Sequence, residues 1–221
     1  MIHTILFYFL LFIIYSFAGW VMEVIVFFFL EKKFINRGFL IGPYCPIYGF
    51  CSILMVLTFS PYTQVPFALF IMAAVLCTVV EYLTSYVMEK LFNTRWWDYS
   101  DLTFNVNGRV CLKNSVLFGL LGCFLIYFAN PFLSTLISQM PENVLNAISL
   151  ALLALFVADN ITSFNIISRV KDTSLSVLKD STEEITEKVK EILRKKSFLN
   201  RRLLNAFPNL KTILRKRKAK K

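Results

Sequence analysis

The sequence predicts an all-α fold, a polytopic membrane helical bundle of about five transmembrane helices with a cytoplasmic amphipathic helical tail. Hydrophobic residues make up 57% of the 221 residues, and the mean hydropathy is +0.60. They form long uncharged runs that suit a hydrocarbon layer rather than a soluble core. By contrast, residues 194–221 contain twelve Lys or Arg and no Asp or Glu. We therefore expect a transmembrane domain over residues 1–168 and a charged tail over 169–221.

The apolar runs place the transmembrane spans at five positions along the chain: about 4–30, 47–60, 67–92, 115–137 and 144–167. The first run is too long for the core of a secretory signal and lacks a small-residue cleavage site, so it should stay in the membrane. The second run is short for a full crossing, which predicts a tilt or the use of preceding residues.

The distribution of basic residues predicts the orientation. Through residue 168 there are only seven, all in or beside the first and third loops, whereas the second and fourth loops have none: Lys32, Lys33, Arg37, Lys90, Arg95, Arg109 and Lys113. Positive charge favours the cytoplasmic side of a membrane. The first and third loops and the C-terminal tail should therefore be cytoplasmic, and the N-terminus should lie outside.

The tail alternates basic and apolar residues from Arg194 onward, as in a basic amphipathic helix. Each basic residue near an anionic membrane surface contributes about 1 kcal/mol of attraction. We expect residues 194–221 to contact anionic lipid or a protein partner. Nucleic acid is the competing interpretation, and we do not expect it for a tail tethered beneath a bilayer.

One polar segment, Arg95-Trp96-Trp97-Asp98-Tyr99-Ser100, separates the third and fourth apolar runs. Arg95 of this segment, Arg37 of the first loop and Arg109 should all lie at the cytoplasmic membrane interface. Three guanidinium groups would then lie near one another, and Asn36 is adjacent to one of them. Guanidinium groups bind phosphate or carboxylate through paired hydrogen bonds. These residues predict a pocket for an anionic group, with Asn36, Trp96 and Asp98 at its rim. The alternative is that they only mark the cytoplasmic helix ends.

Two acidic residues, Glu23 and Glu81, fall within apolar spans. A carboxylate facing lipid costs a few kcal/mol, so each should face protein as a proton site, a solute contact or the partner of an arginine. Glu89 and Asp98 are expected to be ordinary ion-pair partners, and Asp159 to cap or pair locally. Glu23 and Glu81 also precede Arg37 and Arg95 by the same interval, which is consistent with either a parallel internal repeat or chance.

Evidence for catalysis is weaker. Cys45 and Cys111 lie near arginines, which can lower a thiol pKa, but His3 is the only histidine and is expected on the opposite side. We expect no metal site and no cofactor. The chain has no glycine-rich ATP-binding loop, so a non-enzyme is favoured, although the assignment stays open.

Several motifs within residues 10–125 resemble the type IV ABC-transporter permease family (CmpB-type integral membrane proteins). These are Tyr15-Ser16-x-x-Gly19-Trp20-x-x-Glu23, Asn36-Arg37-Gly38-Phe39-Leu40-x-Gly42-Pro43-x-Cys45-Pro46-Ile47-Tyr48-Gly49, Glu81-Tyr82-x-Thr84-Ser85-x-x-Met88-Glu89, Arg95-Trp96-Trp97-Asp98-Tyr99-Ser100 and Asn107-Gly108-Arg109-x-Cys111-Leu112. The resemblance implies a multi-pass protein of a bacterial plasma membrane and a separate ATPase subunit as a partner.

Three functions remain open from the sequence. The favoured one is a membrane transporter or permease component that handles an anionic or amphiphilic solute from a cytoplasm-facing polar pocket. The contacts would come from Glu23, Asn36, Arg37, Glu81, Arg95, Trp96, Asp98 and Arg109. One alternative is a membrane enzyme acting on a phosphate-bearing lipid at the cytoplasmic interface, and the other is a non-catalytic membrane scaffold. The sequence does not predict an oligomeric state.

Overall fold

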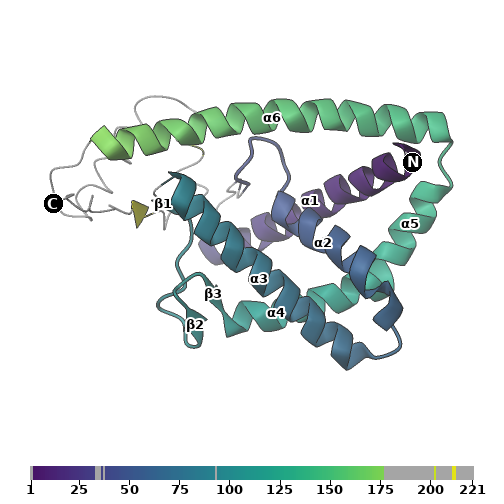
Figure 1. Cartoon of the computed structure of the whole chain (residues 1–221), viewed down its shortest axis with the longest axis horizontal. Coiled ribbons are helices and arrows are strands. Elements are labelled where there is room, and N and C mark those ends of the chain that lie inside the picture. The colour runs from purple at the N-terminus through teal and green to yellow at the C-terminus, as the bar shows by residue number, and fades with distance from the viewer. Residues whose placement is uncertain are drawn as a thin grey trace, which may run out of the picture.

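The computed structural model describes residues 2–32, 36, 38–92, 94–176, 202 and 211–212. Within these residues the chain is almost entirely helical (Figure 1), with helices α1 (Ile2–Glu31), α2 (Pro46–Phe59), α3 (Pro66–Phe92), α4 (Leu112–Phe124), α5 (Asn130–Ser138) and α6 (Glu142–Ser176). In the described part of the chain, four helical segments are long and apolar enough to cross a membrane: Ile2–Phe29, Pro66–Phe92, Leu112–Ser138 and Glu142–Asn165. The predicted all-α membrane bundle is confirmed.

The second apolar run forms a shorter helical segment, Pro46–Tyr62, which includes a 3₁₀ turn after α2. The 14 residues of α2 span about 21 Å, less than the roughly 30 Å of a hydrocarbon core. The reason is the preceding loop, which folds back along α1 so that the Cys45 amide donates to the carbonyl of Ser16 at 2.9 Å. The residues before Cys45 therefore extend along α1 as a loop, in the place where a longer α2 would have continued as a helix. A fifth crossing stays a prediction.

Close packing of α2 against α1 depends on glycine. A side-chain carbon at Gly49 would clash with the Ser16 hydroxyl and the Phe12 carbonyl, and one at Gly19 would clash with the ring of Tyr48. Helix backbones approach closely in a membrane where such small residues meet. These glycines set the distance between α1 and α2.

Helices α4 and α5 together form the predicted fourth span. They are joined by a π-helical turn, Leu125–Ala129, directly before Asn130 and Pro131. Proline has no amide hydrogen and disturbs the preceding turn, which accounts for the irregularity. Two hydrogen bonds hold this bend, from the Tyr127 hydroxyl to the Thr63 carbonyl at 2.7 Å and from the Tyr15 hydroxyl to Asn130 at 3.0 Å.

Helix α6 runs along α1 at one side of the bundle (Figure 1) and continues as one helix to Ser176, beyond the predicted end of the fifth span near residue 167. The buried Ser149 hydroxyl donates to the Leu6 carbonyl at 3.2 Å, and the ring of Phe156 packs against Phe12 at 5.5 Å. The predicted amphipathic helix from residue 194 lies outside the described residues, apart from Arg202 and 211–212.

The loop between α3 and α4 contains a short hairpin. Strand β2 (Asn105–Val106) pairs antiparallel with β3 (Val110–Cys111), and β1 (Thr94–Arg95) pairs with β4 (Lys211–Thr212) of the tail. Asn107 and Gly108 occupy the hairpin turn with φ of 54° and 67°. An Asn-Gly pair favours this left-handed turn.

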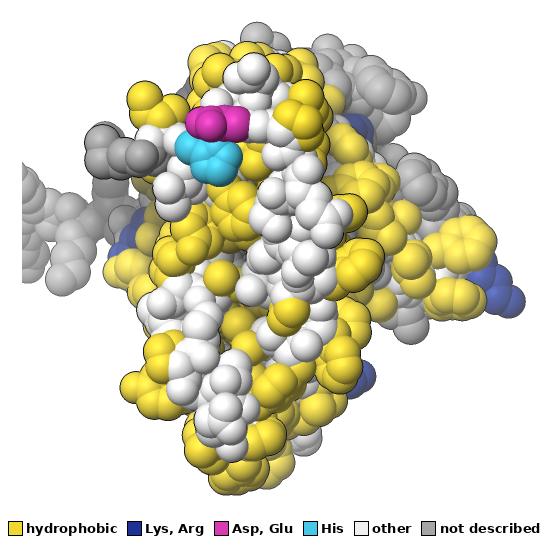
Figure 2. All heavy atoms as spheres, turned by 90° about the vertical axis from the view of Figure 1, so that its right-hand side faces the viewer, with side chains coloured by type: hydrophobic (Ala, Val, Ile, Leu, Met, Phe, Trp, Pro, Cys, Tyr) yellow, Lys and Arg dark blue, Asp and Glu magenta, His cyan; other side chains and the backbone are white. Residues whose placement is uncertain are grey.

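The outer surface of the bundle is largely apolar, with Phe29, Phe67 and Phe132 about three-quarters exposed at 76%, 75% and 69%. Such a surface suits lipid rather than water. The end of the molecule that carries the N-terminus and the α5–α6 turn shows mostly hydrophobic and neutral side chains (Figure 2), in keeping with loops that lack basic residues.

Candidate functional site

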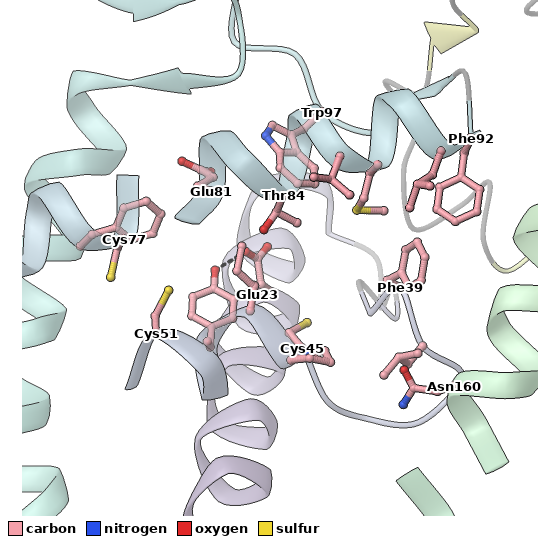
Figure 3. A pocket seen from close by; sticks show the side chains of 18 of the residues that line it. Glu23, Phe39, Cys45, Cys51, Cys77, Glu81, Thr84, Phe92, Trp97 and Asn160 are labelled. Carbon is pink, nitrogen blue, oxygen red and sulfur yellow. Dashed lines mark hydrogen bonds between the residues drawn. The ribbon is translucent and has the colours of Figure 1, made fainter. Parts of the chain in front are cut away.

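A cavity of about 410 Å³ lies between α1, α2 and α3, and the first and third loops border it. Phe118 of α4 and Asn160 and Phe164 of α6 also line it. Its walls are mainly aliphatic and aromatic, and Figure 3 shows Cys51 and Cys77 facing each other at one end with Phe39 and Phe92 at the other. The volume is within the range of small-molecule sites, about 300–1,000 Å³. The cavity is therefore large enough for a small organic solute.

Two carboxylates from the membrane spans line this cavity, as Glu23 comes from α1 and Glu81 from α3. Each accepts a hydrogen bond from a tyrosine. The Tyr48 hydroxyl donates to Glu23 Oε1 at 2.5 Å (Figure 3), and the Tyr99 hydroxyl donates to Glu81 Oε1 at 3.2 Å. The structure thus brings together the two acids that the sequence singled out.

Glu81 is the more enclosed of the two carboxylates. Its exposed fraction is 7%, and its Oε2 atom is buried with no hydrogen-bond partner among the described residues. An unpartnered carboxylate oxygen is costly in an apolar environment. Glu81 therefore presents an unsatisfied acceptor at the cavity.

The third loop positions the tyrosine that contacts Glu81. The Tyr99 amide donates to the Gly108 carbonyl at 2.8 Å, and the Trp97 indole donates to the Arg109 carbonyl at 3.0 Å, so the hairpin holds both rings. Burial raises the pKa of the Tyr99 hydroxyl well above its usual range, and the Glu81 carboxylate raises this pKa further. Tyr99 therefore remains a hydrogen-bond donor at neutral pH.

Two arginines, Arg95 and Arg109, form a separate cluster around Glu89. Arg109 Nη2 lies 2.8 Å and Arg95 Nε lies 3.2 Å from the same oxygen, Glu89 Oε2, and Arg95 Nη1 lies 3.7 Å from Asp98. Glu89 and Asp98 are thus ion-pair partners, as predicted. Neither arginine is among the residues that line the cavity, and Arg37 lies outside the described residues.

Arg109 is buried, with an exposed fraction of 6%. It also donates to the Ser85 hydroxyl at 3.2 Å, and its guanidinium carbon lies 5.7 Å and 5.5 Å from the ring centres of Tyr82 and Tyr86. Aromatic faces and a shared carboxylate both stabilise a buried guanidinium. In this arrangement Arg109 fastens the third loop to α3.

The other predicted rim residues have structural contacts. Asn36 Oδ1 accepts from the Trp20 indole at 2.7 Å and from the Gly38 amide at 3.2 Å, which shapes the first loop. Trp96 has an exposed fraction of 2% and packs against Phe39, with ring centres 5.5 Å apart. The neighbouring Trp97, which was not among the predicted site residues, lines the cavity instead.

Asp159 on α6 has a larger role than the local contact predicted for it. Its carboxylate accepts hydrogen bonds from the amides of Ile41 and Gly42 at 2.9 Å and 2.7 Å, and from the hydroxyls of Tyr44 and Ser163 at 2.5 Å and 2.8 Å. The first loop is therefore fastened to α6 mainly by one carboxylate, and the Ser163 hydroxyl oxygen also accepts from the Ile41 amide at 3.2 Å. The signal in the sequence was an acid within the fifth apolar run, but the partners could not be read from it.

A protein-family comparison matches residues 10–164 to the family described as "Putative ABC-transporter type IV". The chain belongs to this family. The match runs from within α1 to within α6, and so includes at least part of every helix that borders the cavity of this ABC-transporter-related membrane protein. Neither the curated proteins nor the solved structures gave a match.

Proposed function

We propose that the protein is a permease component of a membrane transport system that handles an amphiphilic solute through the cavity between α1, α2 and α3. The observation that carries this proposal is the composition of the cavity, in which Glu23 and Glu81 face walls that are mainly apolar and aromatic, with Thr84 and Asn160 as neutral polar residues. An ionisable residue within a span marks a solute or ion pathway by default. An amphiphile would contact both kinds of surface.

The expected solute was anionic or amphiphilic, and the contacts favour the amphiphilic form. Arg95 and Arg109 share one carboxylate oxygen of Glu89, and the two carboxylates at the cavity would repel an anion. The same arrangement weakens the alternative of an enzyme that clamps a lipid phosphate between arginines.

We also propose that the first and third loops and the tail are cytoplasmic, that the N-terminus lies outside, and that the membrane is a bacterial plasma membrane. The seven basic residues of the membrane domain support this orientation. Membership of the family supports a separate ATPase as the energy source, because this chain has no ATP-binding motif of its own. Anionic lipid or a protein partner is proposed for residues 194–221.

The proposal is tested in inside-out membrane vesicles from cells that express the full chain, with uptake of a fluorescent amphiphile measured with and without ATP. ATP-dependent uptake should require the chain and should fall at least tenfold in the double variant Glu23→Gln/Glu81→Gln. Glu142→Gln, which removes an exposed acid at the start of α6, is the matched control. Uptake that is the same with and without the chain would contradict the proposal.

A further inference from the structure

We propose that the cavity selects a lipophilic organic cation, whose positive charge lies against Glu81 and whose apolar body lies against the aromatic walls. This inference rests on the proposed function, since it names the class of amphiphile that the same cavity would take. It begins from charge, because among the described residues two carboxylates and no Lys or Arg line the cavity.

The position of Glu81 is the first argument. Tyr99 satisfies only Oε1, while Oε2 is buried and has no hydrogen-bond partner in the described part of the chain. A carboxylate held in this way is stabilised by a nearby positive charge, and the low dielectric of the site strengthens that attraction. Glu23 from α1 lines the same cavity, so the solute meets a second acidic side chain there.

The aromatic walls are the second argument. Trp97 and the two tyrosines that hold the carboxylates, Tyr48 and Tyr99, line the cavity together with four phenylalanines: Phe39, Phe92, Phe118 and Phe164. The faces of indole and phenol rings attract cations, and a delocalised or alkylated cation also gains from burial of its apolar surface. Acidic and aromatic side chains around one cavity form a site that distinguishes a lipophilic cation from an anion of the same shape.

A bare metal ion fits the cavity less well. Hard cations need about six oxygen ligands, and one oxygen of each carboxylate already accepts a tyrosine hydrogen bond. The described residues also include no group of three His, Cys, Asp or Glu side chains able to hold a metal ion. A proton could occupy Glu81 Oε2, but a proton alone would not use the aromatic walls.

The test uses the purified full chain in phosphatidylcholine nanodiscs with two probes of equal shape and opposite charge, tetraphenylphosphonium and tetraphenylborate. The readout is the rate at which N-ethylmaleimide modifies Cys77, which lines the cavity, measured by mass spectrometry. Cys123 is the internal control, because it is free and not among the lining residues. Nanodiscs without protein correct for partitioning of each probe into lipid.

Tetraphenylphosphonium should slow modification of Cys77 and leave Cys123 unchanged, whereas tetraphenylborate should protect neither. In Glu81→Gln the concentration of phosphonium needed for half protection should rise at least tenfold. The control Glu142→Gln, at the exposed start of α6, should behave as the wild type.

Comparison of the two probes on the wild-type chain needs no variant, so the inference remains testable even if Glu81→Gln fails to fold. Equal protection by both probes, protection by borate alone, or an unchanged phosphonium requirement in folded Glu81→Gln would each overturn the cation inference. The first two results would leave the amphiphile cavity of the proposed function standing. Protection by neither probe would refute both.

Discussion

Replacing Asp159 with asparagine should release the first loop from α6. The carboxylate has four donors, two on each oxygen: the Ile41 amide and Ser163 hydroxyl on Oδ1, and the Gly42 amide and Tyr44 hydroxyl on Oδ2. An asparagine amide keeps one accepting oxygen and presents N–H groups on the other side, so either orientation removes two of these four hydrogen bonds. The Ile41 amide also has a second acceptor, the Ser163 hydroxyl oxygen at 3.2 Å.

The expected cost follows from those two lost bonds. A hydrogen bond to a charged group contributes about 1.5–3 kcal/mol, and part of the loss is recovered when the freed donors turn to water. A net cost of about 2–4 kcal/mol would raise the population of the open loop by roughly 30-fold or more, since each 1.4 kcal/mol is about tenfold.

Cys45 offers a direct measurement of this opening. It ends the first loop, its amide bonds to the Ser16 carbonyl, and its exposed fraction is 8%. In nanodiscs, modification of Cys45 by a water-soluble maleimide should be roughly 30-fold faster in Asp159→Asn than in the wild type if the rate follows the open population. Thr162→Ala, which removes an exposed hydroxyl bonded within α6, is the matched control and should leave the rate unchanged. Wild-type reactivity of Cys45 in a folded Asp159→Asn variant would refute the reasoning.

Three further substitutions test the packing around the site. Glu89→Gln should lower the free energy of unfolding by about 3–5 kcal/mol because it leaves the buried Arg109 without its carboxylate. Lys90→Gln, at the exposed neighbouring residue, should have little effect. Thermal unfolding in nanodiscs compares the two variants. Gly108→Ala should lower the free energy of unfolding by at least about 1–2 kcal/mol, because residue 108 has a φ of 67° and the new methyl group would clash with Asp98 and Ser100. Tryptophan fluorescence and a melting temperature like those of the wild type would contradict this prediction. Gly49→Ala should lower the melting temperature by pushing α2 from α1, and an unchanged melting temperature would mean that this contact is looser than the structure shows.

The sequence predicted the fold class and most helix positions because the membrane imposes a simple requirement. A span must be long, apolar and nearly free of charge, and local composition is enough to recognise such a run. The first, third, fourth and fifth runs could therefore be located from the chain alone. The second was recognised as short, but its length depends on where Cys45 meets Ser16, a contact between distant parts of the chain.

The site was only partly visible in the sequence. Glu23 and Glu81 stand out as charges inside apolar runs, and both line the cavity. The arginines were expected beside them, but Arg95 and Arg109 contact Glu89, because side chains at the end of α3 and in the hairpin meet only after the loop has folded. Trp96 is buried, whereas Trp97 lines the cavity. The sequence could not predict which of the two would do which, because they are adjacent residues of the same type.

The sequence by itself therefore determined that this chain is a helical membrane protein with acids inside its spans and cations at one end of them. Only the tertiary structure decided which charges neutralise one another and which one remains unsatisfied. Hydropathy is a property of each segment alone, whereas ion pairing depends on distances between segments. Among the residues that the structure describes, Glu89 therefore pairs with two arginines, whereas Glu81 has a single tyrosine partner at the cavity.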